Sequence, residues 1–546
     1  MSSARGTGLD FGTTTTLVAS TDGVIVLGDR TPWMSSLVGY DASGGLVAGV
    51  EEEAAAEDRT VRSIKRAITS GEQNARLTLD DGPRDVPADT VMTAILAEAA
   101  RRGASNGVDL TRPGAVRLGC PAMWDGRQRR RLLAIAESAG IPVGLADLID
   151  EPVAAGIAWL TRQRPDSSAP LRVVVFDMGG GTLDVAVLDV RGSSARDVSV
   201  LAAIGSTLAG DALDAAIAED IESLLDVDTE KLANPRRARG RVADAAREAK
   251  VALTADTEFV VSLPARLFGE RASAEVTYSR DRLEAAFKPL MDRAEETVIA
   301  ALRTARLTEL EPGSPHDIRR VPLGSLLAGV DVVVLSGGMA RVPYLAQRLR
   351  GLFGESTVVE PAIEYGADDL ALGPECAVVL GLARAGEYGR INMFRPALDI
   401  WIEWADQSRL LYQAYTPVVA PWQTFVGGSH LRYVRNGLDL DLPRGGTGQL
   451  RVVSYTGGAS RATLGGKSLD GFPVALCEQQ FEFSLYPNGR LRMVDGAGEF
   501  EGQLDDWHVM VGADHDQRLA RLVEPRLPEP TVEYPFNMER ADPFSR

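Results

Sequence analysis

The sequence is poor in cysteine and histidine, which limits the metal and redox chemistry that it can support. Its 546 residues contain 3 cysteines and 4 histidines. Because Cys120, Cys376 and Cys477 lie far apart, no C-x-x-C pair can bind zinc locally and no disulfide framework can form. Such low cysteine usage favours a reducing compartment, and we expect a cytoplasmic protein.

Positive charge is also scarce. The chain has 58 Lys and Arg against 76 Asp and Glu, a formal net charge of −18. A surface of that charge repels phosphate backbones and anionic lipid headgroups, so we expect no nucleic-acid partner and no membrane partner. No apolar run approaches the roughly 20 residues that a membrane-spanning helix needs. A composition of 45% hydrophobic and 25% charged residues is instead typical of a globular chain with several domains.

The spacing of apolar residues along the sequence changes near residue 385. Before it, β-branched runs at 173–176, 185–188 and 332–335 predict buried strands, and apolar residues at helical spacing predict helices within 91–102, 213–224 and 283–302. From Leu398 onwards apolar and polar residues alternate, which predicts half-buried strands. Asn488-Gly489 between two alternating segments predicts a β-hairpin. An α/β region is therefore followed by a small all-β domain.

These changes divide the chain into four parts. We expect an α/β nucleotide-binding domain at 1–388, a linker at 389–397, a β domain at 398–510 and a tail at 511–546. Because the tail carries five of the chain's prolines, we expect it to be extended.

One short pattern occurs twice. Gly8–Thr14 and Val175–Thr182 each consist of a strand, an Asp, an apolar residue and a Gly/Thr turn. Glycines let backbone N–H groups approach phosphate oxygens, and the adjacent Asp can hold Mg²⁺ directly or through water. A single copy is better explained by an ordinary β-turn, but two matching copies favour a clamp on a polyphosphate. A Rossmann fingerprint fails at Phe11, and a Walker A loop fails at Arg461, where glycine is required.

With three further segments, Leu148–Gly156, Val334–Pro343 and Pro374–Gly381, the two hairpins resemble the five ATPase motifs of the actin, hexokinase and 70-kDa heat-shock superfamily. The 70-kDa heat-shock chaperones are the most similar group, through the forms I-D-E-P-x-A-A-G and G-G-x-x-R-V-P. The resemblance covers about residues 7–385, and the β domain more faintly resembles the family's substrate-binding β-sandwich. It implies a two-lobed actin-like ATPase fold followed by a small sandwich-like all-β domain.

The resemblance also implies ATP or ADP, Mg²⁺ and a monovalent cation as cofactors, with the cation at Asp184. The implied catalytic residues are Asp10, Thr13, Lys65, Glu151, Asp177 and Thr182, of which Asp10, Glu151 and Asp177 form the metal shell. The implied nucleotide-binding residues are Gly12, Thr13, Thr14, Gly179, Gly180, Gly181, Thr182, Asp184, Lys250, Gly337, Gly338, Met339, Arg341 and Glu375.

Several of these residues have plainer interpretations. Lys65, with its arginine neighbours, would also suit a solvated basic helix face, and Glu151 with Pro152 would also suit a helix start. Gly337-Gly338 would also suit a strand-to-helix turn. The arginine-rich run 127–131 predicts an exposed helix face.

The sequence departs from the family pattern in three places. Val251 stands where an arginine normally packs on adenine, and Met339 replaces the usual serine of the adenosine turn, so adenosine binding is expected to be weaker or less base-specific. Residues 388–396 lack the family's acidic and leucine-rich linker, which puts coupling between the domains in doubt. No amphipathic helical bundle follows the β domain, so we expect no helical lid.

Our leading hypothesis is a slowly ATP-hydrolysing chaperone-like switch whose lidless β domain binds an extended polypeptide client, served by a co-chaperone or exchange factor. The second hypothesis is an interaction, assembly or reactivation factor with one dedicated protein partner. The third is a small-molecule kinase of the same fold. Trp401, Tyr412, Tyr415 and Trp422 are candidate pocket residues, although a role in the core of the sandwich fits each of them better.

Overall fold

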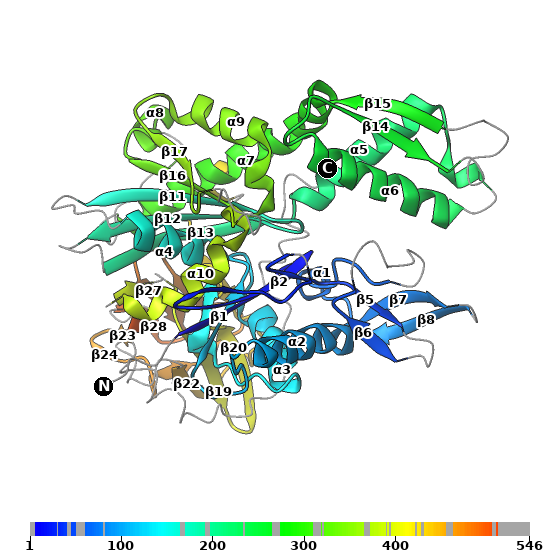
Figure 1. Ribbon diagram of the computed structural model, residues 1–546. Coiled ribbons are helices and arrows are strands. Elements are labelled where there is room, and N and C mark those ends of the chain that lie inside the picture. Colours follow the sequence, from blue (N-terminus) through cyan, green and yellow to red (C-terminus); the bar gives the residue numbers. More distant parts are fainter. Residues whose placement is uncertain are drawn as a thin grey trace.

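The computed structural model describes residues 6–29, 31–40, 45–50, 60–79, 82–163, 170–191, 197–232, 235–264, 274–309, 318, 321–364, 372–388, 390–392, 395–420, 423–426, 431–454, 462–504 and 509–511. They form two α/β lobes and a β domain, as the sequence predicts (Figure 1).

The first lobe contains a mixed sheet with strand order β10-β9-β1-β2-β3, in which β4 also pairs with β2. These strands are β1 (Thr7–Phe11), β2 (Thr15–Ser20), β3 (Gly23–Ile25), β4 (Met34–Ser35), β9 (Val116–Cys120) and β10 (Leu148–Asp150). Two small sheets are formed by β5 (Val38–Tyr40) with β6 (Leu46–Ala48) and by β7 (Asn74–Leu79) with β8 (Gly82–Pro87). The helices are α1 (Arg66–Ser70), α2 (Ala88–Ser105), α3 (Gly126–Ser138) and the 3-10 turn η3 (Leu145–Asp147). The predicted helix within 91–102 is confirmed as part of α2.

The second lobe contains a sheet with strand order β17-β16-β11-β12-β13-β18-β29. Its strands are β11 (Leu171–Met178), β12 (Leu183–Arg191), β13 (Asp197–Ser206), β16 (Val332–Ser336), β17 (Val358–Pro361), β18 (Arg390–Asn392) and β29 (Val509–Val511). A hairpin of β14 (Glu258–Leu263) and β15 (Ala274–Ser279) forms a separate small sheet. The α-helices are α5 (Gly210–Leu225), α6 (Pro235–Ala252), α7 (Arg280–Thr308), α8 (Leu323–Leu327) and α9 (Pro343–Phe353). The 3-10 turns are η4 (Thr229–Lys231), η7 (Gly338–Arg341), η8 (Pro374–Cys376) and η9 (Ala385–Glu387).

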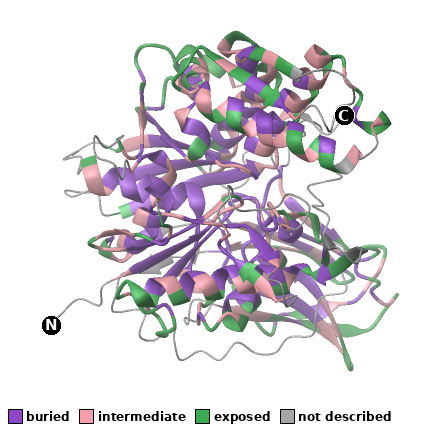
Figure 2. Cartoon of the chain, turned by 45° about the vertical axis from the view of Figure 1, so that its right-hand side comes forward, coloured by how far each residue is buried: buried purple, intermediate pink, exposed green. Residues whose placement is uncertain are grey.

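The three strands predicted from β-branched runs are confirmed as β11, β12 and β16, and the two longer helical patterns as α5 and α7. Buried residues gather in the two central sheets and in the helices between them (Figure 2). This distribution follows from the sequence, because runs without a polar face must be covered on both sides.

Two helices lie between the central sheets and join the lobes (Figure 1). Helix α4 (Glu151–Gln163) packs on β11 and β12, and α10 (Ala377–Arg384) packs on β1, β2 and β9. The two helices touch each other at Gly381, where a Cβ atom would lie only 1.7 Å from the carbonyl oxygen of Ala154. The helices can approach this closely because Gly381 has no side chain.

We therefore expect Gly381→Ala to lower the free energy of unfolding by about 1–3 kcal/mol, the usual cost of overfilling a packed interior. Urea unfolding of the full-length protein measures the change. Gly351→Ala is a matched control in α9, because a Cβ there meets nothing within 4 Å. That control is expected to stabilise the protein by up to about 1 kcal/mol, since alanine orders a helix at lower entropic cost. Equal effects of the two substitutions would contradict the packing argument.

The β domain consists of two sheets packed face to face around one apolar cluster. The first sheet contains β19 (Leu398–Trp404), β20 (Gln407–Tyr412), β22 (Thr447–Ser454) and β25 (Pro473–Ala475). The second contains β21 (Tyr433–Asn436), β23 (Ala462–Leu464), β24 (Lys467–Ser468), β26 (Glu482–Leu485), β27 (Arg490–Asp495) and β28 (Gly498–Leu504), and the short helix α11 (Gln423–Val426) precedes β21. The predicted hairpin is confirmed by β26 and β27, whose turn has Gly489 at a φ of 84°.

The predicted linker does not leave the two α/β lobes as a free segment. Residues 390–392 form β18, which pairs in parallel with β13 of the second lobe. The predicted tail lies outside the described residues apart from Val511, which ends β29. Among the helices that the structure describes, none combines the length and the apolar character required to cross a bilayer.

Candidate functional site

The turns of the two repeated hairpins face each other across the lobes. In the first, Gly12 N donates to Thr15 O at 2.9 Å, and in the second Gly179 N donates to Thr182 O at 3.0 Å. A Cβ atom on Gly180 would lie 2.6 Å from Thr14 Oγ1. One on Gly181 would lie 2.5 Å from Thr13 Oγ1. The two turns therefore lie against each other, and their backbone N–H groups and threonine hydroxyls share one space.

Buried carboxylates lie behind the turns. Asp10 is in β1, and Asp177 in β11 pairs across the strands with Asp184 in β12. Glu151 is the first residue of α4. All four are buried, and Asp184 Oδ1 also accepts a hydrogen bond from Ala122 N at 2.7 Å. Four acids in one interior need compensating positive charge.

Lys65 supplies part of this charge. Its Nζ lies 2.5 Å from Glu151 Oε1, with both side chains buried, and it also lies 5.6 Å from the centre of the Trp124 ring. The interpretation of Lys65 as a solvated basic face is therefore wrong. Glu151 does open a helix, as its plainer interpretation predicts, but it also pairs with Lys65.

The titration of these groups follows from their burial. Burial raises the pKa of Asp10 to about 7, and the charge of Glu151 adds to the effect. For the same two reasons the pKa of Asp184 is also raised to about 7 and that of Asp177 lies well above its ordinary value. Burial would lower the pKa of Lys65, but the charges of Glu151 and Asp10 raise it above its usual range. The site is short of positive charge and favours a bound cation.

The donor set fits Mg²⁺. Among the described residues, no three His, Cys, Asp or Glu side chains form a metal cage by themselves. Mg²⁺ seldom uses such cages; it binds one or two carboxylates and completes its octahedron with waters and substrate phosphates. Asp10 and Asp177 offer carboxylate oxygens beside the turns, and Glu151 lies in the same acidic group.

The predicted adenosine-side residues all belong to the second lobe. Lys250 Nζ in α6 lies 2.6 Å from Asp214 Oδ1 in α5, and Arg341 in η7 pairs through two nitrogens with the carboxylate of Glu375 in η8. Met339 is buried, and Val251 is 66% exposed. The exposed valine provides no cation that could stack on a base.

The predicted adenosine-side residues adjoin the two Gly/Thr turns through close backbone contacts. Gly210 N donates to Gly179 O at 3.1 Å, so the start of α5 rests on the second turn. A Cβ on Gly210 would lie 3.3 Å from Met339 Sδ. Gly337, followed by Gly338 in η7, has a φ of 81°, and a Cβ there would collide with the carbonyl oxygen of Met178. The Gly337-Gly338 pair is a strand-to-helix turn, as its plainer interpretation holds, and it lies directly behind the phosphate turn.

Two ion pairs near Lys65 join the lobes and were not predicted. Arg66 Nη1 in α1 lies 3.5 Å from Asp211 Oδ2 in α5, and Arg62 Nη2 lies 4.0 Å from Asp244 Oδ1 in α6. The sequence feature that could have indicated these ion pairs is the position of Arg62 and Arg66 beside Lys65.

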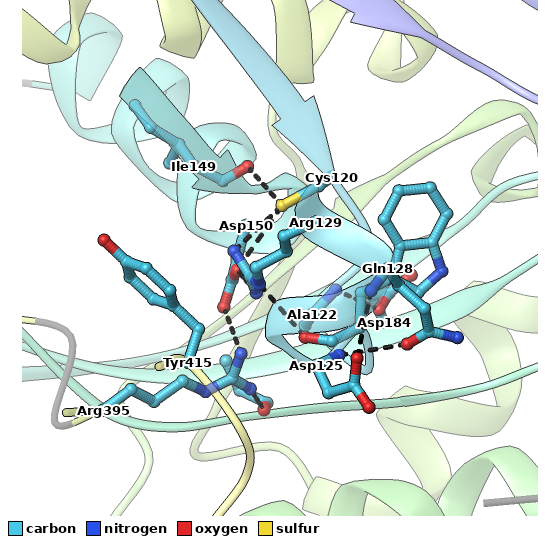
Figure 3. Close-up of polar contacts among 12 residues, drawn as sticks. Cys120, Ala122, Asp125, Gln128, Arg129, Ile149, Asp150, Asp184, Arg395 and Tyr415 are labelled. Atoms are coloured by element: carbon cyan, nitrogen blue, oxygen red, sulfur yellow. Dashed lines mark hydrogen bonds and ion pairs between the residues drawn. The ribbon is translucent and has the colours of Figure 1, made fainter. Parts of the chain in front are cut away.

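The prediction of an exposed arginine face at 127–131 is wrong for its central residue. Arg129 is 1% exposed and forms an ion pair with Asp150 of β10, which is fully buried (Figure 3). Arg395 Nη1 lies 3.2 Å from the other carboxylate oxygen of Asp150. Helical spacing turns Arg129 inward, and the acid that can receive it lies 21 positions away in the chain. The signal was present in the sequence, because Asp150 belongs to the same I-D-E-P segment as Glu151.

The candidate pocket aromatics are not available as pocket residues. Trp401, Tyr412 and Tyr415 are at most 7% exposed. Tyr412 packs edge-on against Tyr433 in the sandwich core. Tyr415 instead joins the core of the first lobe, where the Arg129 guanidinium lies 5.3 Å from the centre of the Tyr415 ring. Trp422 lies outside the described residues.

Comparison with known proteins identifies the family. The sequence model described as "Hsp70 protein" matches residues 90–368, about half of the chain. The chain belongs to the Hsp70 family. The match begins in α2, ends within the second lobe and includes the second phosphate turn.

Individual relatives agree with this result. The chain is 28% identical to "Chaperone protein DnaK" of Thermosipho melanesiensis over 405 residues and 29% identical to that of Thermotoga neapolitana over 413 residues. Each match covers 70% of this chain and 60% of the relative. "Heat shock protein SSC3, mitochondrial" of Saccharomyces cerevisiae is 30% identical over 270 residues, 48% of this chain and 36% of that protein. The matches thus span about 60% of the length of the DnaK relatives, so the activity and partners of whole Hsp70 chaperones are not established for this chain.

Proposed function

We propose that the protein binds ATP with Mg²⁺, hydrolyses it slowly and uses the nucleotide in a chaperone-like role. The observation that carries this proposal is the pair of opposed Gly/Thr turns above a buried acidic group that contains one lysine. Such a site suits phosphoryl transfer to water, in which positioning and charge neutralisation lower the barrier. Because transfer to water by positioning and charge neutralisation demands no strong general base, such a site can turn over slowly.

The roles of individual residues follow from their positions. The turn amides of Gly12, Gly179, Gly180 and Gly181, with the hydroxyls of Thr13, Thr14 and Thr182, would bind phosphate oxygens. Asp10, Asp177 and Glu151 would hold Mg²⁺ and its waters, and bound Mg²⁺ would neutralise charge on the phosphates. Lys65 would orient the attacking water and stabilise charge on the transferred group. Asp184 would hold a monovalent cation.

The nucleoside would bind on the second lobe near Lys250, Gly338, Met339, Arg341 and Glu375. Because Val251 gives no stacking cation, we propose a weaker hold on the base, by about 1 kcal/mol, than an arginine would provide. We also propose a cytoplasmic location, consistent with the low cysteine content.

The β domain would bind a polypeptide. Two versions of this role remain: extended clients of many kinds, served by a co-chaperone or exchange factor, or one dedicated protein partner in an assembly or reactivation role. The burial of Trp401, Tyr412 and Tyr415 favours the dedicated partner, because it removes three candidate pocket residues. A small-molecule kinase is the least supported alternative, since no further motif supplies a base for a substrate hydroxyl.

The test is the rate of phosphate release from ATP by the full-length protein with Mg²⁺, measured with and without a panel of extended apolar peptides. We expect slow hydrolysis that one or more peptides change. A rate that no peptide alters would favour the dedicated partner, and transfer of phosphate to a small molecule would favour the kinase. Absence of both hydrolysis and nucleotide binding would contradict the proposal.

A further inference from the structure

The β domain is inserted between two adjacent strands of the second lobe's sheet. Strand β18 precedes the domain and β29 follows it, and the two pair antiparallel, with Ile391 opposite Met510. The strand at the entry of the domain, β18, is therefore hydrogen-bonded to the strand at its exit, β29. On its other side, β18 is hydrogen-bonded to β13 of the second lobe. A domain attached through a single linker lacks this second anchor.

The entry segment is packed against the two lobes at each residue whose burial the structure describes. Tyr388, Ile391, Arg395 and Ala397 are all buried. The hydroxyl of Tyr388 lies 3.0 Å from Thr161 Oγ1 in α4, and Ile391 belongs to the apolar cluster between the lobes. These contacts remove apolar surface from water, so release of the segment costs free energy.

Arg395 ties the entry segment to both lobes (Figure 3). Its guanidinium pairs with Asp150 of the first lobe and donates to the carbonyl oxygen of Ala203 in β13 of the second. Because the charges are buried, withdrawal of Arg395 would leave Asp150 with Arg129 as its one remaining ion-pair partner among the described residues. Loss of a partner from a buried ion group is strongly unfavourable.

The body of the β domain also contacts both lobes. Asp399 in β19 accepts from Arg130 Nη2 in α3 at 2.8 Å, and Gly126 in α3 fits against the backbone of Ala414. On the second lobe Arg303 Nη1 in α7 donates to Thr424 O at 3.0 Å, and its guanidinium lies 4.9 Å from the centre of the Phe425 ring. The contacts are spread over α3, α7, β10 and β13.

We propose that β29 acts as a strap that keeps the β domain docked on both lobes in every nucleotide state. The strap pairs with β18 at the exit of the domain, so β18 cannot leave β13 unless β29 leaves with it or the β18–β29 pairing breaks. The pairing of β18 with β29 also closes the β domain into a loop. When one contact between the domain and a lobe breaks, the remaining contacts hold its two partners close together, so the contact forms again readily. Any binding by the β domain then uses the docked form. This goes beyond the proposed function and does not require ATP hydrolysis.

The first test needs no variant. Small-angle X-ray scattering and amide hydrogen exchange are measured on the full-length protein without nucleotide, with Mg²⁺ and ADP, and with Mg²⁺ and ATP, and calorimetry reports nucleotide binding separately. We expect one radius of gyration and equally slow exchange of residues 390–392 in all three states. Expansion of the protein or faster exchange there with either nucleotide would overturn the proposal.

The second test breaks the strap in the full-length chain. Proline has no N–H group, and successive residues of a strand point their N–H groups to opposite sides, so Val509→Pro with Met510→Pro removes whichever donor faces β18. We expect exchange of residues 390–392 to rise at least about tenfold and the radius of gyration to increase, already without nucleotide. The matched control, Val509→Thr with Met510→Thr, keeps both N–H groups and is expected to behave as the unaltered protein.

The outcomes separate the strap from the proposed function. Unaltered exchange in the proline variant would overturn the strap even if ATP is hydrolysed. Absence of heat on mixing with nucleotide would count against the proposed function, while the nucleotide-free comparison of the two variants would still decide the strap. A proline variant that does not fold leaves the first test of the full-length protein in force.

Discussion

Lys65→Ala is expected to lower the rate of ATP hydrolysis at least about 100-fold, the usual effect of removing one group that stabilises charge in a transition state. The ammonium of Lys65 is buried beside Glu151 and next to the Phe11 and Trp124 rings, so no water-exposed cation can take its place. Nucleotide binding should persist, because the turns on both lobes supply the phosphate contacts. Single-turnover hydrolysis and calorimetry with ADP measure the two effects separately.

The control for Lys65 is its neighbour. Arg66→Ala removes a cation whose side chain is 56% exposed and which pairs with Asp211 of the second lobe. A partly exposed pair of this kind contributes little, so hydrolysis is expected to stay close to that of the unaltered protein. Equal activity of the Lys65 variant, or loss of nucleotide binding together with hydrolysis, would exclude the proposed role.

Asp150→Ala is expected to lower the free energy of unfolding by about 3–5 kcal/mol, the usual cost of removing one partner from a buried ion group. Asp150 is fully buried and holds two guanidinium groups, one from α3 and one from the segment before the β domain. Without it, the charges of Arg129 and Arg395 would remain close together in the interior. Urea unfolding of the full-length protein gives the loss.

A partly exposed arginine–aspartate pair in the same region serves as the comparison. Arg131 of α3 pairs with Asp89 of α2 at 2.8 Å, but the Asp89 side chain is 50% exposed. Asp89→Ala should therefore cost no more than about 1 kcal/mol. If Asp150→Ala costs as little as this, the three-residue group does not contribute to stability in the way that its burial suggests.

The two Gly/Thr turns and their close approach could be predicted because they depend on local chemistry. Two copies of a strand, Asp and Gly/Thr turn are visible in the sequence, and the same residues that form each turn also bring it close to its partner. The strands β11, β12 and β16 were equally visible, since their β-branched runs permit little else.

The arrangement around Arg129 was not predictable from the run that contains it. Residues 127–131 include four arginines, and the run alone does not show that β10 places an acid against one of them. Tyr415 was misjudged for a related reason: its burial depends on contact between the β domain and the first lobe, which no local pattern reports.

The two strands that hold the β domain also could not be predicted from the sequence. β18 and β29 are three residues each, too short for any periodicity to appear, and they pair across more than a hundred positions of sequence. From the sequence, residues 388–396 could be described only as lacking the acidic and leucine-rich linker of the family. Of these residues, Ile391 and Arg395 are buried against partners that lie in parts of the chain far from them.

The order of strands in the second lobe also affects how the chain is made. Strand β13 is complete by Ser206, but its neighbour β18 begins at Arg390, and β29 at Val509. A ribosome delivers the amino-terminal part first, so the edge of β13 emerges long before the strand that covers it. Unpaired edges recruit strands from other chains, which is a route to aggregation. During its own synthesis this Hsp70 relative therefore exposes a strand edge that is open to pairing with other chains until β18 arrives.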